Sequence, residues 1–400
     1  MNYLVAADDC FLDRPGGMGR VAWDIAQLMR ERGHLVGMVC MNHDPARFPN
    51  GLSEQNGVRI VRYQRPDLPA WHPGRMSACI EAASKAVWEH FSETSWHLVH
   101  MHTAFTGGGV FQVLGRNPRY VYTMHSPIVL ENEINWAQQG IVGRIKAWMG
   151  LGKLKAAEHK VLDPATDIQT LSNFTKVQVD HFHKMGHKVR VIPHWRRPEL
   201  RREMDKAEAR RRLGWPLDEK ILFTVRIHGP RYGIDVAIRA AAPLIQDKRC
   251  WFAIGGDGPL RPTLENLAKE LGVAERTRFT GRLSDADLAL AYQAADLFVL
   301  PTLSLECFGL ITIEAMSFGC PVIGTDAGAT PEILDKYCPG LVVPAGNVEA
   351  LREKLGAYFA GRLQTPDEAA TVAFIEKNYG RDVIVPKLID LLEVQTGRRR

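Results

Sequence analysis

Short apolar runs alternate with helical stripes along almost the whole chain. The runs are bounded by glycine or polar residues, as is typical of buried strands. Between two of them Val21, Ile25, Leu28 and Met29 form a helical stripe that Gly33 ends. Such alternation predicts parallel sheets with helices on both faces. The predicted strands are 3–6, 35–41, 58–61, 98–102, 120–124, 168–171 and 189–192 in the first half, and 221–225, 251–254, 278–280, 297–300, 321–324 and 341–343 in the second.

A change of composition near residue 195 divides the chain. The segment 193–198 is followed by a charge-dense stretch to Arg212, in which carboxylates are interleaved with arginines. This mixture predicts a solvated helix held by ion pairs rather than a nucleic-acid patch. We therefore predict one domain over 1–195, a second over 196–377, and a final helix at about 378–400 that could pack back on the first. Ligands bind beyond the carboxyl ends of strands in such domains, so we expect the site in a cleft between them.

Composition narrows the class of protein. Four hundred residues with 46% hydrophobic content are ample for two globular domains. The net charge of +5 is mild and argues against a nucleic-acid partner. The seven cysteines form no Cys-x-x-Cys pair, which favours free thiols in a reducing cytosol. The first residues read as a strand rather than a signal peptide, and no apolar run of about 18 residues exists. We expect a cytoplasmic protein.

Two glutamates mark the most informative stretch of the second half. Glu306 follows the apolar run 297–300, and Glu314 lies seven intervening residues later inside a predicted helix. Gly309, between them, allows close approach to the backbone. The free amides of the helix's first turn then suit a phosphate. One carboxylate can face a sugar ring, and the other can accept hydrogen bonds from a ribose diol.

This stretch resembles the Glu-x7-Glu signature of the retaining glycosyltransferases of family 4. The matching segments are Leu297-Phe-Val-Leu-Pro301, Glu306-Cys-Phe-Gly-Leu310, Glu314-Ala-Met-Ser-Phe-Gly-Cys-Pro-Val322 and Gly328-Ala-Thr-Pro-Glu332. The resemblance extends over nearly the whole chain. It implies the GT-B fold, an α/β architecture of two Rossmann-like parallel-sheet domains facing a central cleft. It also implies transfer of a hexose-type sugar from a nucleoside-diphosphate sugar to a hydroxyl group.

Three further motifs gain a role from the resemblance. Gly16 and Gly17, after the first strand, match the family's glycine loop at the donor diphosphate or sugar, although a simple tight turn is the alternative. His125, at a strand end, matches a histidine beside the donor sugar, although most lone histidines are structural. The stretch 280–283, with Leu283, matches the segment whose backbone meets the base.

The phosphate-binding segment shows a departure from the family. Arg226 fits the family's arginine, but Tyr232 occupies the usual lysine position. Arg231, one residue earlier, could supply the missing charge because its planar fork pairs well with phosphate oxygens. The resemblance thus implies Glu306, His125 and Arg226 as catalytic residues. The implied donor-binding residues are Gly16, Gly17, Arg226, Arg231, Leu283, Phe308, Gly309, Leu310 and Glu314.

We expect no cofactor besides the nucleotide sugar, and no metal, because arginines and a helix terminus can neutralise a leaving diphosphate. A UDP-sugar is favoured over a GDP-sugar by family frequency alone, and the acceptor is unknown. Two alternatives stay open. One is a glycoside hydrolase that uses Glu306 and Glu314 as an acid and nucleophile pair. The other is a non-catalytic sugar-nucleotide-binding protein, which the tyrosine at position 232 motivates.

Two weaker features complete the sequence. His100 and His102 share one face of a predicted strand, a spacing that could suit a metal but that we interpret as polar lining near the acceptor. The segment 141–162 interleaves apolar and basic residues and could rest on anionic lipid as an amphipathic helix. Its glycines, Gly143, Gly150 and Gly152, weaken it as a helix. An ordinary inter-domain helix is the favoured interpretation, with peripheral membrane contact as the alternative.

Overall fold

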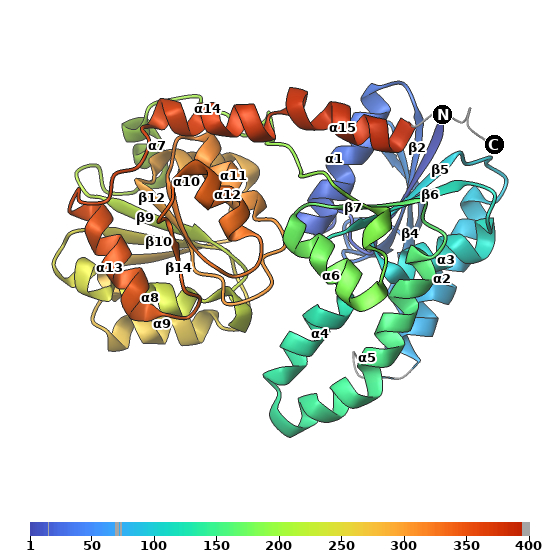
Figure 1. The fold of residues 1–400 in the computed structure, drawn as a ribbon, viewed down its shortest axis with the longest axis horizontal. Helices are drawn as coiled ribbons and strands as arrows, with labels where there is room; N and C mark the ends of the chain where they lie inside the picture. Colours follow the sequence, from blue (N-terminus) through green and yellow to red (C-terminus); the bar gives the residue numbers. More distant parts are fainter. Residues whose placement is uncertain (15, 69–71, 73, 394–400) are drawn as a thin grey trace. The chain divides into compact units, whose positions relative to one another are not determined.

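The chain forms two compact units in a computed structural model that describes residues 1–14, 16–68, 72 and 74–393. Unit 1 comprises Met1–Ile192 together with the end of the chain from Leu388, and unit 2 comprises Pro193–Lys387. Each unit is an α/β sheet sandwiched by helices (Figure 1). Within the described residues, no helix is both long enough and apolar enough to cross a membrane.

Unit 1 is built on an eight-stranded sheet in the order β3-β4-β2-β1-β5-β6-β7-β8. All neighbours pair in parallel except β3 and β4. The strands are β1 (Asn2–Ala6), β2 (Leu35–Asn42), β3 (Gly51–Gln55), β4 (Val58–Gln64), β5 (Leu98–Met101), β6 (Arg119–Met124), β7 (Asp167–Thr170) and β8 (Val189–Val191). Every predicted strand of the first half is present, with ends shifted by at most a few residues.

Strand β3, which pairs with β4 in the antiparallel direction, is not among the predicted strands. It is polar and only half-buried, so no apolar run marked it. It is joined to β4 through Asn56 and Gly57, which both have positive φ, at 50° and 74°. An Asn-Gly pair is the strongest short-range signal of a hairpin turn, and it was the signal that could have revealed this antiparallel strand.

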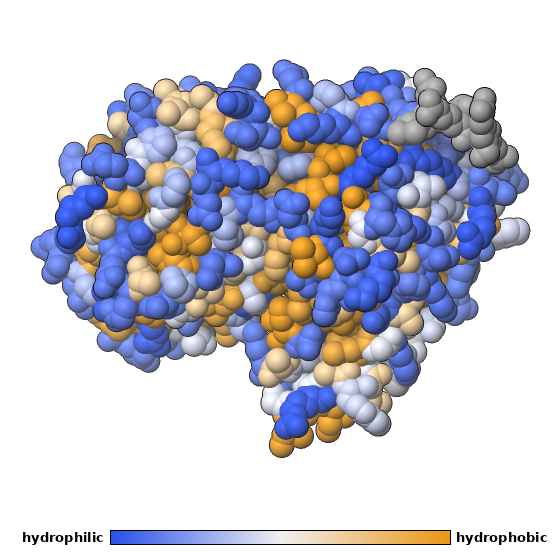
Figure 2. Space-filling model, in the orientation of Figure 1, coloured by the Kyte–Doolittle hydropathy of each residue, from blue (hydrophilic) through white to orange (hydrophobic). Residues whose placement is uncertain are grey.

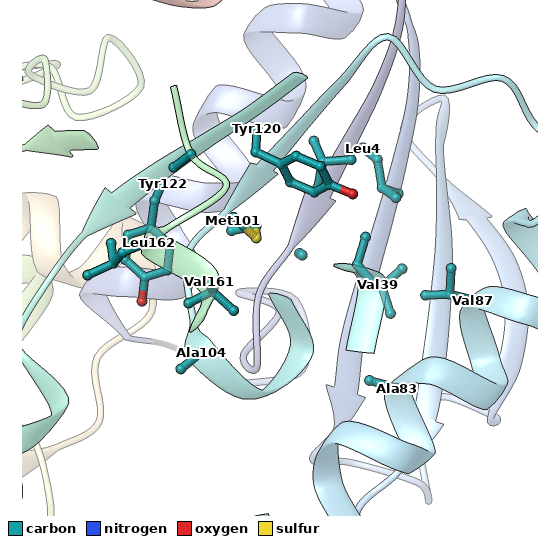
Figure 3. Packing of buried hydrophobic residues seen from close by; sticks show 14 of the residues in the cluster. Leu4, Val39, Ala83, Val87, Met101, Ala104, Tyr120, Tyr122, Val161 and Leu162 are labelled. Carbon is teal, nitrogen blue, oxygen red and sulfur yellow. The ribbon is translucent and has the colours of Figure 1, made fainter. Parts of the chain in front are cut away.

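Helices cover the sheet of unit 1 and enclose its core. They are α1 (Gly17–Glu31), α2 (Arg75–Phe91), α3 (Ala104–Leu114), α4 (Ile128–Ala137), α5 (Gly140–Leu162) and α6 (Asn173–His183), with a 3₁₀ turn η1 (Gly186–Lys188). In the core, Leu4 and Val39 of the sheet pack near Val87 of α2, and Tyr122 lies near Leu162 of α5 (Figure 3). The stripe predicted on 21–29 is buried on α1 as expected.

Unit 2 has a wholly parallel six-stranded sheet in the order β11-β10-β9-β12-β13-β14. The strands are β9 (Ile221–Val225), β10 (Trp251–Gly255), β11 (Thr277–Gly281), β12 (Leu297–Leu300), β13 (Val322–Thr325) and β14 (Val342–Val343). The first strand lies inside the sheet, and the order reverses between β9 and β12. Loops that follow these two strands therefore diverge at the sheet's carboxyl edge, where doubly wound folds bind ligands.

The helices of unit 2 are short, and one of them runs on into the end of unit 1. They are α7 (Lys206–Leu213), α8 (Ile234–Gln246), α9 (Arg261–Glu270), α10 (Asp285–Ala294), α11 (Leu310–Ser317), α12 (Thr330–Tyr337), α13 (Val348–Phe359) and α14 (Glu368–Tyr379), with 3₁₀ turns η2 (Pro230–Tyr232) and η3 (Ala274–Arg276). The last helix, α15 (Arg381–Glu393), begins in unit 2, and its residues from Leu388 belong to unit 1.

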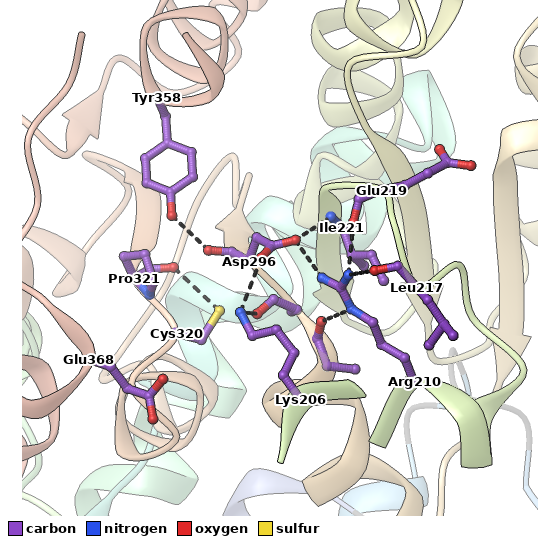
Figure 4. A network of polar contacts seen from close by, with 12 residues as sticks. Lys206, Arg210, Leu217, Glu219, Ile221, Asp296, Cys320, Pro321, Tyr358 and Glu368 are labelled. Carbon is purple, nitrogen blue, oxygen red and sulfur yellow. Dashed lines mark hydrogen bonds and ion pairs between the residues drawn. The ribbon is translucent and has the colours of Figure 1, made fainter. Parts of the chain in front are cut away.

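Helix α7 is less solvated than the charge pattern predicted. Glu208 does pair with Arg211 and Arg212 at the surface, as expected. Arg210, however, is buried, and its guanidinium donates to Asp296 Oδ2 at 2.7 Å and to the Ala294 carbonyl at 3.0 Å (Figure 4). An arginine within a charge run can anchor its helix when carbonyls and a carboxylate satisfy its five donors. The run alone did not distinguish this residue from its neighbours.

Candidate functional site

An ion pair spans the point in unit 2 where the strand order reverses. Arg226 follows β9, while Thr302 and Glu306 follow β12. The Nη2 of Arg226 donates to Glu306 Oε2 at 2.7 Å and to Thr302 Oγ1 at 3.1 Å. Thr302 Oγ1 in turn donates to the same Glu306 oxygen at 3.1 Å. Glu306 is 8% exposed and Thr302 is fully buried, so this charged triad is largely shielded from solvent.

Tyr232 contacts Arg226 of that triad and a second arginine, Arg231. The guanidinium carbons of Arg226 and Arg231 each lie 4.7 Å from the centre of its ring. The Tyr232 hydroxyl also accepts a hydrogen bond from Arg231 Nη2 at 3.0 Å. Each cation is attracted to the electron-rich face of the ring. The tyrosine at the usual lysine position therefore orders both arginines in the loop after β9.

Arg231 also fixes the backbone that leads to Glu306. Its Nη1 donates to the Leu305 carbonyl at 3.0 Å, and its own carbonyl accepts from the Leu303 amide at 2.8 Å. Leu305 has a φ of 59°, in the left-handed region that residues other than glycine rarely adopt. Such a conformation persists only when the surroundings impose it, and it occurs often at ligand sites.

Helix α11 begins at Leu310, four residues after Glu306, with Gly309 as its N-terminal cap at φ 91°. The Glu306 carbonyl accepts the Ala329 amide at 2.7 Å. A Cβ on Gly328 would lie 2.2 Å from that same carbonyl oxygen, so only glycine fits there. The loop before α12 thus fixes the backbone of Glu306.

Glu314 contacts different partners on the second turn of α11. Its Oε1 accepts from Arg197 Nε at 3.1 Å, and its Oε2 accepts from the Tyr292 hydroxyl at 3.0 Å. Arg197 also pairs with Asp285 at 3.1 Å. Burial raises the pKa of Tyr292 well above its ordinary value, so its hydroxyl stays a donor. The two glutamates of the signature therefore lie on one segment but in separate surroundings.

Backbone hydrogen bonds connect the loops that follow β9, β10 and β11 at the carboxyl edge of the unit 2 sheet. The Arg226 amide donates to the Gly255 carbonyl at 3.1 Å, and the Gly256 amide donates to the Gly281 carbonyl at 2.8 Å. A Cβ on Gly255 would lie 3.3 Å from Leu283 Cδ1. Leu283, which we predicted to lie at the base, therefore packs against Gly255. The loops after β9, β10 and β11 form one continuous rim beside the ion pair.

In unit 1 the predicted glycine loop is held by a buried ion pair. Gly16 caps α1, and Gly17 is its first residue. Just before them, Asp13 accepts from Arg62 Nη2 at 2.8 Å and Nε at 2.9 Å, with both side chains fully buried. This ion pair therefore holds the segment that leads into the glycine loop. Pro15, which belongs to the same motif, lies outside the described residues.

His125 is partnered by a second histidine at the end of β5. Its Nε2 lies 2.8 Å from His102 Nδ1, and the two rings stack with centroids 5.1 Å apart. His102 is 2% exposed, whereas His125 is half-buried. His125 is thus the accessible member of the pair. His102 can orient it, a role the sequence did not indicate.

His100 is a structural residue rather than pocket lining. The Ile192 carbonyl accepts from Gln169 Nε2 at 2.9 Å, so the Gln169 amide oxygen faces Thr123 and accepts its hydroxyl at 2.8 Å. Thr123 Oγ1 can then only accept from His100 Nε2, at 2.6 Å. His100 Nδ1 is left to accept from the Tyr3 hydroxyl, also at 2.6 Å. Burial lowers the pKa of His100 to about 3, as this neutral ring requires.

Asp8 was missed by the sequence analysis although it lies two residues after the end of β1. It accepts from Thr106 Oγ1 at 2.6 Å, the Thr106 amide at 3.1 Å and Thr103 Oγ1 at 2.8 Å. Burial raises its pKa from the ordinary value. It ties the loop after β1 to the start of α3, where the strand order of unit 1 reverses. The position of this aspartate near the carboxyl end of a predicted strand could have identified it from the sequence.

The predicted residues therefore divide into three groups. Arg226, Arg231, Glu306 and the segment 308–310 lie together in unit 2. Glu314 is on the same helix but bonds Arg197 and Tyr292, which the sequence did not connect with it. Gly16, Gly17 and His125 belong to unit 1. The role of each residue stays a prediction.

Family comparisons match both halves of the chain. A model described as "Glycosyl transferase 4-like domain" matches residues 16–195, and one described as "Glycosyl transferases group 1" matches residues 205–370. Among curated proteins, an uncharacterized glycosyltransferase of Methanocaldococcus jannaschii is 26% identical over 345 residues, which are 84% of this chain and 83% of that protein. A D-inositol 3-phosphate glycosyltransferase of Thermobispora bispora is 30% identical over 228 residues. That match spans 54% of this chain and about half, 52%, of the relative.

Solved structures confirm the predicted architecture. Sucrose-phosphate synthase of Thermosynechococcus elongatus superposes with a TM-score of 0.83 at 21% identity and covers 97% of both chains. The Anabaena protein HepE, solved in complex with UDP-glucose, superposes with a TM-score of 0.74 at 17% identity over 99% of this chain and all of its own. At these identities the likeness shows the fold alone, which is GT-B with two parallel-sheet α/β domains.

Proposed function

Since the chain belongs to the glycosyltransferases of the GT-B fold, we propose that it moves a hexose-type sugar from a nucleoside-diphosphate sugar to an acceptor hydroxyl with retention of configuration. The observation that carries the proposal is the shielded cluster of Arg226, Thr302 and Glu306 at the reversal point of unit 2, with Arg231 alongside. It combines cations for a diphosphate with a carboxylate for a sugar.

The donor's diphosphate binds to Arg226, Arg231 and the amides of 308–310. Among the described residues, the Nε of Arg226 is buried with no hydrogen-bond acceptor. A buried donor without an acceptor costs about 1–3 kcal/mol, so a phosphate oxygen placed there would relieve that cost. The start of α11 adds partial positive charge. These groups stabilise the negative charge that develops on the leaving diphosphate, which makes a metal unnecessary in this proposal.

Glu306 faces the transferred sugar, and Glu314 accepts from the ribose hydroxyls. Arg226 bridges these roles because its guanidinium bonds Glu306 directly and can reach a phosphate through its other donors. His125 stays our proposed third catalytic residue. We assign the protein to the retaining enzymes of family 4 on the spacing of the two glutamates. Retention without a covalent nucleophile requires attack on the same face that the diphosphate leaves.

A UDP-sugar is our preferred donor. The support is the neighbouring fold of HepE, whose solved complex contains UDP-glucose. A cytoplasmic location is supported by the seven cysteines, all of which are free thiols.

The decisive experiment compares UDP and uridine binding by calorimetry. Arg231→Ala should weaken UDP binding about 10- to 100-fold, because a charge-assisted hydrogen bond contributes about 1.5–3 kcal/mol and 1.4 kcal/mol is one decade. Uridine binding should change little. Arg249→Ala, an exposed arginine before β10 at the opposite end of the sheet, is the matched control. Equal UDP affinity in wild type and Arg231→Ala would remove Arg231 from the phosphate site.

Tyr232 supports one other candidate, a protein that binds sugar nucleotides without turning them over. A tyrosine has no charge to offer the leaving diphosphate where relatives use lysine. UDP release from UDP-glucose, followed with and without added sugar acceptors, separates the two. Tight UDP-glucose binding with no release under any condition would favour the binding protein. The hydrolase alternative gains no support, because Glu306 and Glu314 bond different partners rather than flanking one space.

A further inference from the structure

The helical hairpin α4–α5 of unit 1 carries an exposed apolar stripe near its turn. Five large apolar side chains of α5 within nine residues are solvent-exposed, and Trp148 is the most exposed of them at 87%. They are Ile141, Val142, Ile145, Trp148 and Met149. Figure 2 shows the apolar surface at the free end of the hairpin, and Figure 1 shows α4 and α5 projecting from the strands of their unit. We call these five residues the apolar stripe.

The stripe faces away from the rest of unit 1 because of the helix's glycines. At about 100° per residue, the stripe occupies an arc of roughly 120°, and Gly143 and Gly150 lie nearly opposite its centre. A Cβ on Gly143 would lie 1.7 Å from the Trp136 carbonyl oxygen of α4, and one on Gly150 would lie 2.7 Å from the Trp136 ring. The helix forms across these glycines, and Gly143 and Gly150 let α5 pack closely against α4.

The hairpin is anchored at its base. Glu158 of α5 is buried and accepts the Ile128 amide at the start of α4 at 3.0 Å. Its other oxygen lies 2.8 Å from His183 Nε2 of α6. These contacts tie the base of the hairpin to α6.

Basic residues border the stripe along both edges. By the same rotation of about 100° per residue, Arg144 and Lys155 fall along one edge and Lys146 and Lys153 along the other. None of these four forms an ion pair with any residue that the structure describes, and residues 140–157 contain no carboxylate. Even with Glu131 and Glu133 of α4 counted, the hairpin carries a positive excess.

We propose that the apolar stripe of α5 inserts into the surface of an anionic lipid bilayer, with the bordering basic residues on its headgroups. An apolar arc between two cationic edges is the arrangement of helices that lie in a membrane interface. Tryptophan favours that boundary, because one end of its ring is apolar and the other can be hydrated. A second copy of this chain is the poorer occupant, because its stripe would bring the same cations against these. The proposal rests on unit 1 and not on the transferase chemistry.

The test is co-sedimentation of the full chain with phosphatidylcholine vesicles, with and without phosphatidylglycerol. Wild type should bind only the anionic vesicles and should detach at high salt, which screens the headgroup charges. Trp148→Ala should weaken binding about tenfold or more, since a tryptophan buries a large apolar area. Trp88→Ala is the matched control: Trp88 is 68% exposed on α2, outside the stripe, and its loss should change nothing.

A separate variant tests how much the basic residues contribute to vesicle binding. The double change Arg144→Gln with Lys153→Gln removes one cation from each edge, and each cation near an anionic surface strengthens binding about fivefold. Affinity should then fall about 25-fold. UDP affinity should be unchanged in all four proteins, which separates this result from failure of the proposed function. Equal binding to neutral vesicles, equal loss in Trp88→Ala and Trp148→Ala, or a wild-type dimer that Trp148→Ala dissociates would overturn the proposal.

Discussion

Two side chains donate hydrogen bonds to the same carboxylate oxygen of Glu306. Oε2 accepts from Arg226 Nη2 at 2.7 Å and from Thr302 Oγ1 at 3.1 Å. In the proposed reaction, the fixed carboxylate meets charge that develops on the sugar as the diphosphate departs. A preorganised group of this kind acts without reorganising at the moment of reaction. The residue's importance therefore lies in where its charge is held.

Glu306→Gln should lower turnover by about 10²-fold or more while the fold persists, because loss of one preorganised electrostatic group costs on that scale. Glutamine keeps the size of the side chain and can still accept from Arg226. UDP release from UDP-glucose measures turnover, and thermal unfolding reports the fold. Glu353→Gln, at an exposed position on α13, is the control. Turnover near the wild-type value in folded Glu306→Gln would exclude the carboxylate from the reaction.

His100 allows a spectroscopic prediction. The chain of donors from Gln169 through Thr123 places its proton on Nε2, and burial holds its pKa at about 3. Nitrogen NMR of the imidazoles should therefore show a neutral Nε2–H ring for His100 at every pH from 8 to about 4. Because the unfolded chain binds a proton near 6.5, this group's contribution to stability is complete above pH 6.5 and is lost progressively as pH falls toward 3. An imidazolium signal from His100 at pH 5 would contradict the assignment.

Residues close in sequence were the ones that could be predicted. Glu306, Gly309 and Glu314 lie on one short segment, so a resemblance found them together. Arg197 bonds Glu314 across 117 positions of sequence, and no local pattern links the two. Thr302 was recognisable only as a polar residue at a strand end. The sequence thus indicated which side chains the site uses, but the partners that fix them come from the fold.

At the scale of elements, the loop before α12 fixes the Glu306 backbone. Gly328 has φ 74° and leaves no room for a Cβ, whereas Gly272 has φ 67° and open space around it. Replacing either glycine with alanine should lower the free energy of unfolding by about 1–2 kcal/mol, because alanine is strained in the left-handed region of the backbone. Gly328→Ala should lose more, and should lower turnover, because its Cβ would displace the Glu306 carbonyl.

Chemical denaturation and UDP release on the two glycine variants make this comparison. Similar stability in Gly328→Ala and Gly272→Ala, with normal turnover in both, would show that the close approach to Glu306 has no consequence.

The helices and strands themselves were well predicted from the sequence, because burial of one face imposes a regular spacing of apolar residues on each of them. The polar strand β3 and the buried arginine of α7 escaped, since neither carries an apolar signal of its own.

At the scale of the molecule, the end of α15 belongs to unit 1. Glu393 accepts from Arg32 Nε at 2.7 Å and Nη2 at 2.8 Å, and from His34 Nε2 at 2.8 Å. Arg119 donates to the carbonyls of Leu391 and Leu392 at 2.9 and 3.2 Å. The last turns of the chain therefore complete hydrogen bonds of residues near its start.

The hydrogen bond from Arg32 lowers the pKa of Glu393 to about 2 from an ordinary value of 4.5. Its contribution to stability is therefore complete above pH 4.5 and is lost as pH falls from 4.5 toward 2. Glu393→Gln should lower Tm at pH 7, and the difference from wild type should shrink below pH 4.5. Thermal unfolding across this range, with Glu353→Gln as the unpaired comparison, measures the effect. A difference that stays constant with pH would mean that the carboxylate charge is not what holds the helix end.

The discontinuity of unit 1 has a consequence for how the chain is made. Residues 1–192 leave the ribosome first, but the segment from Leu388 that supplies acceptors to Arg119 follows only after all of unit 2. At about 5–20 residues per second, that delay is about 10–40 s. Until then the Arg119 edge of unit 1 lacks the acceptors that the last helix provides. Completion of this unit is a late event of biosynthesis, and a fragment that stops at Ile192 would never gain these hydrogen bonds.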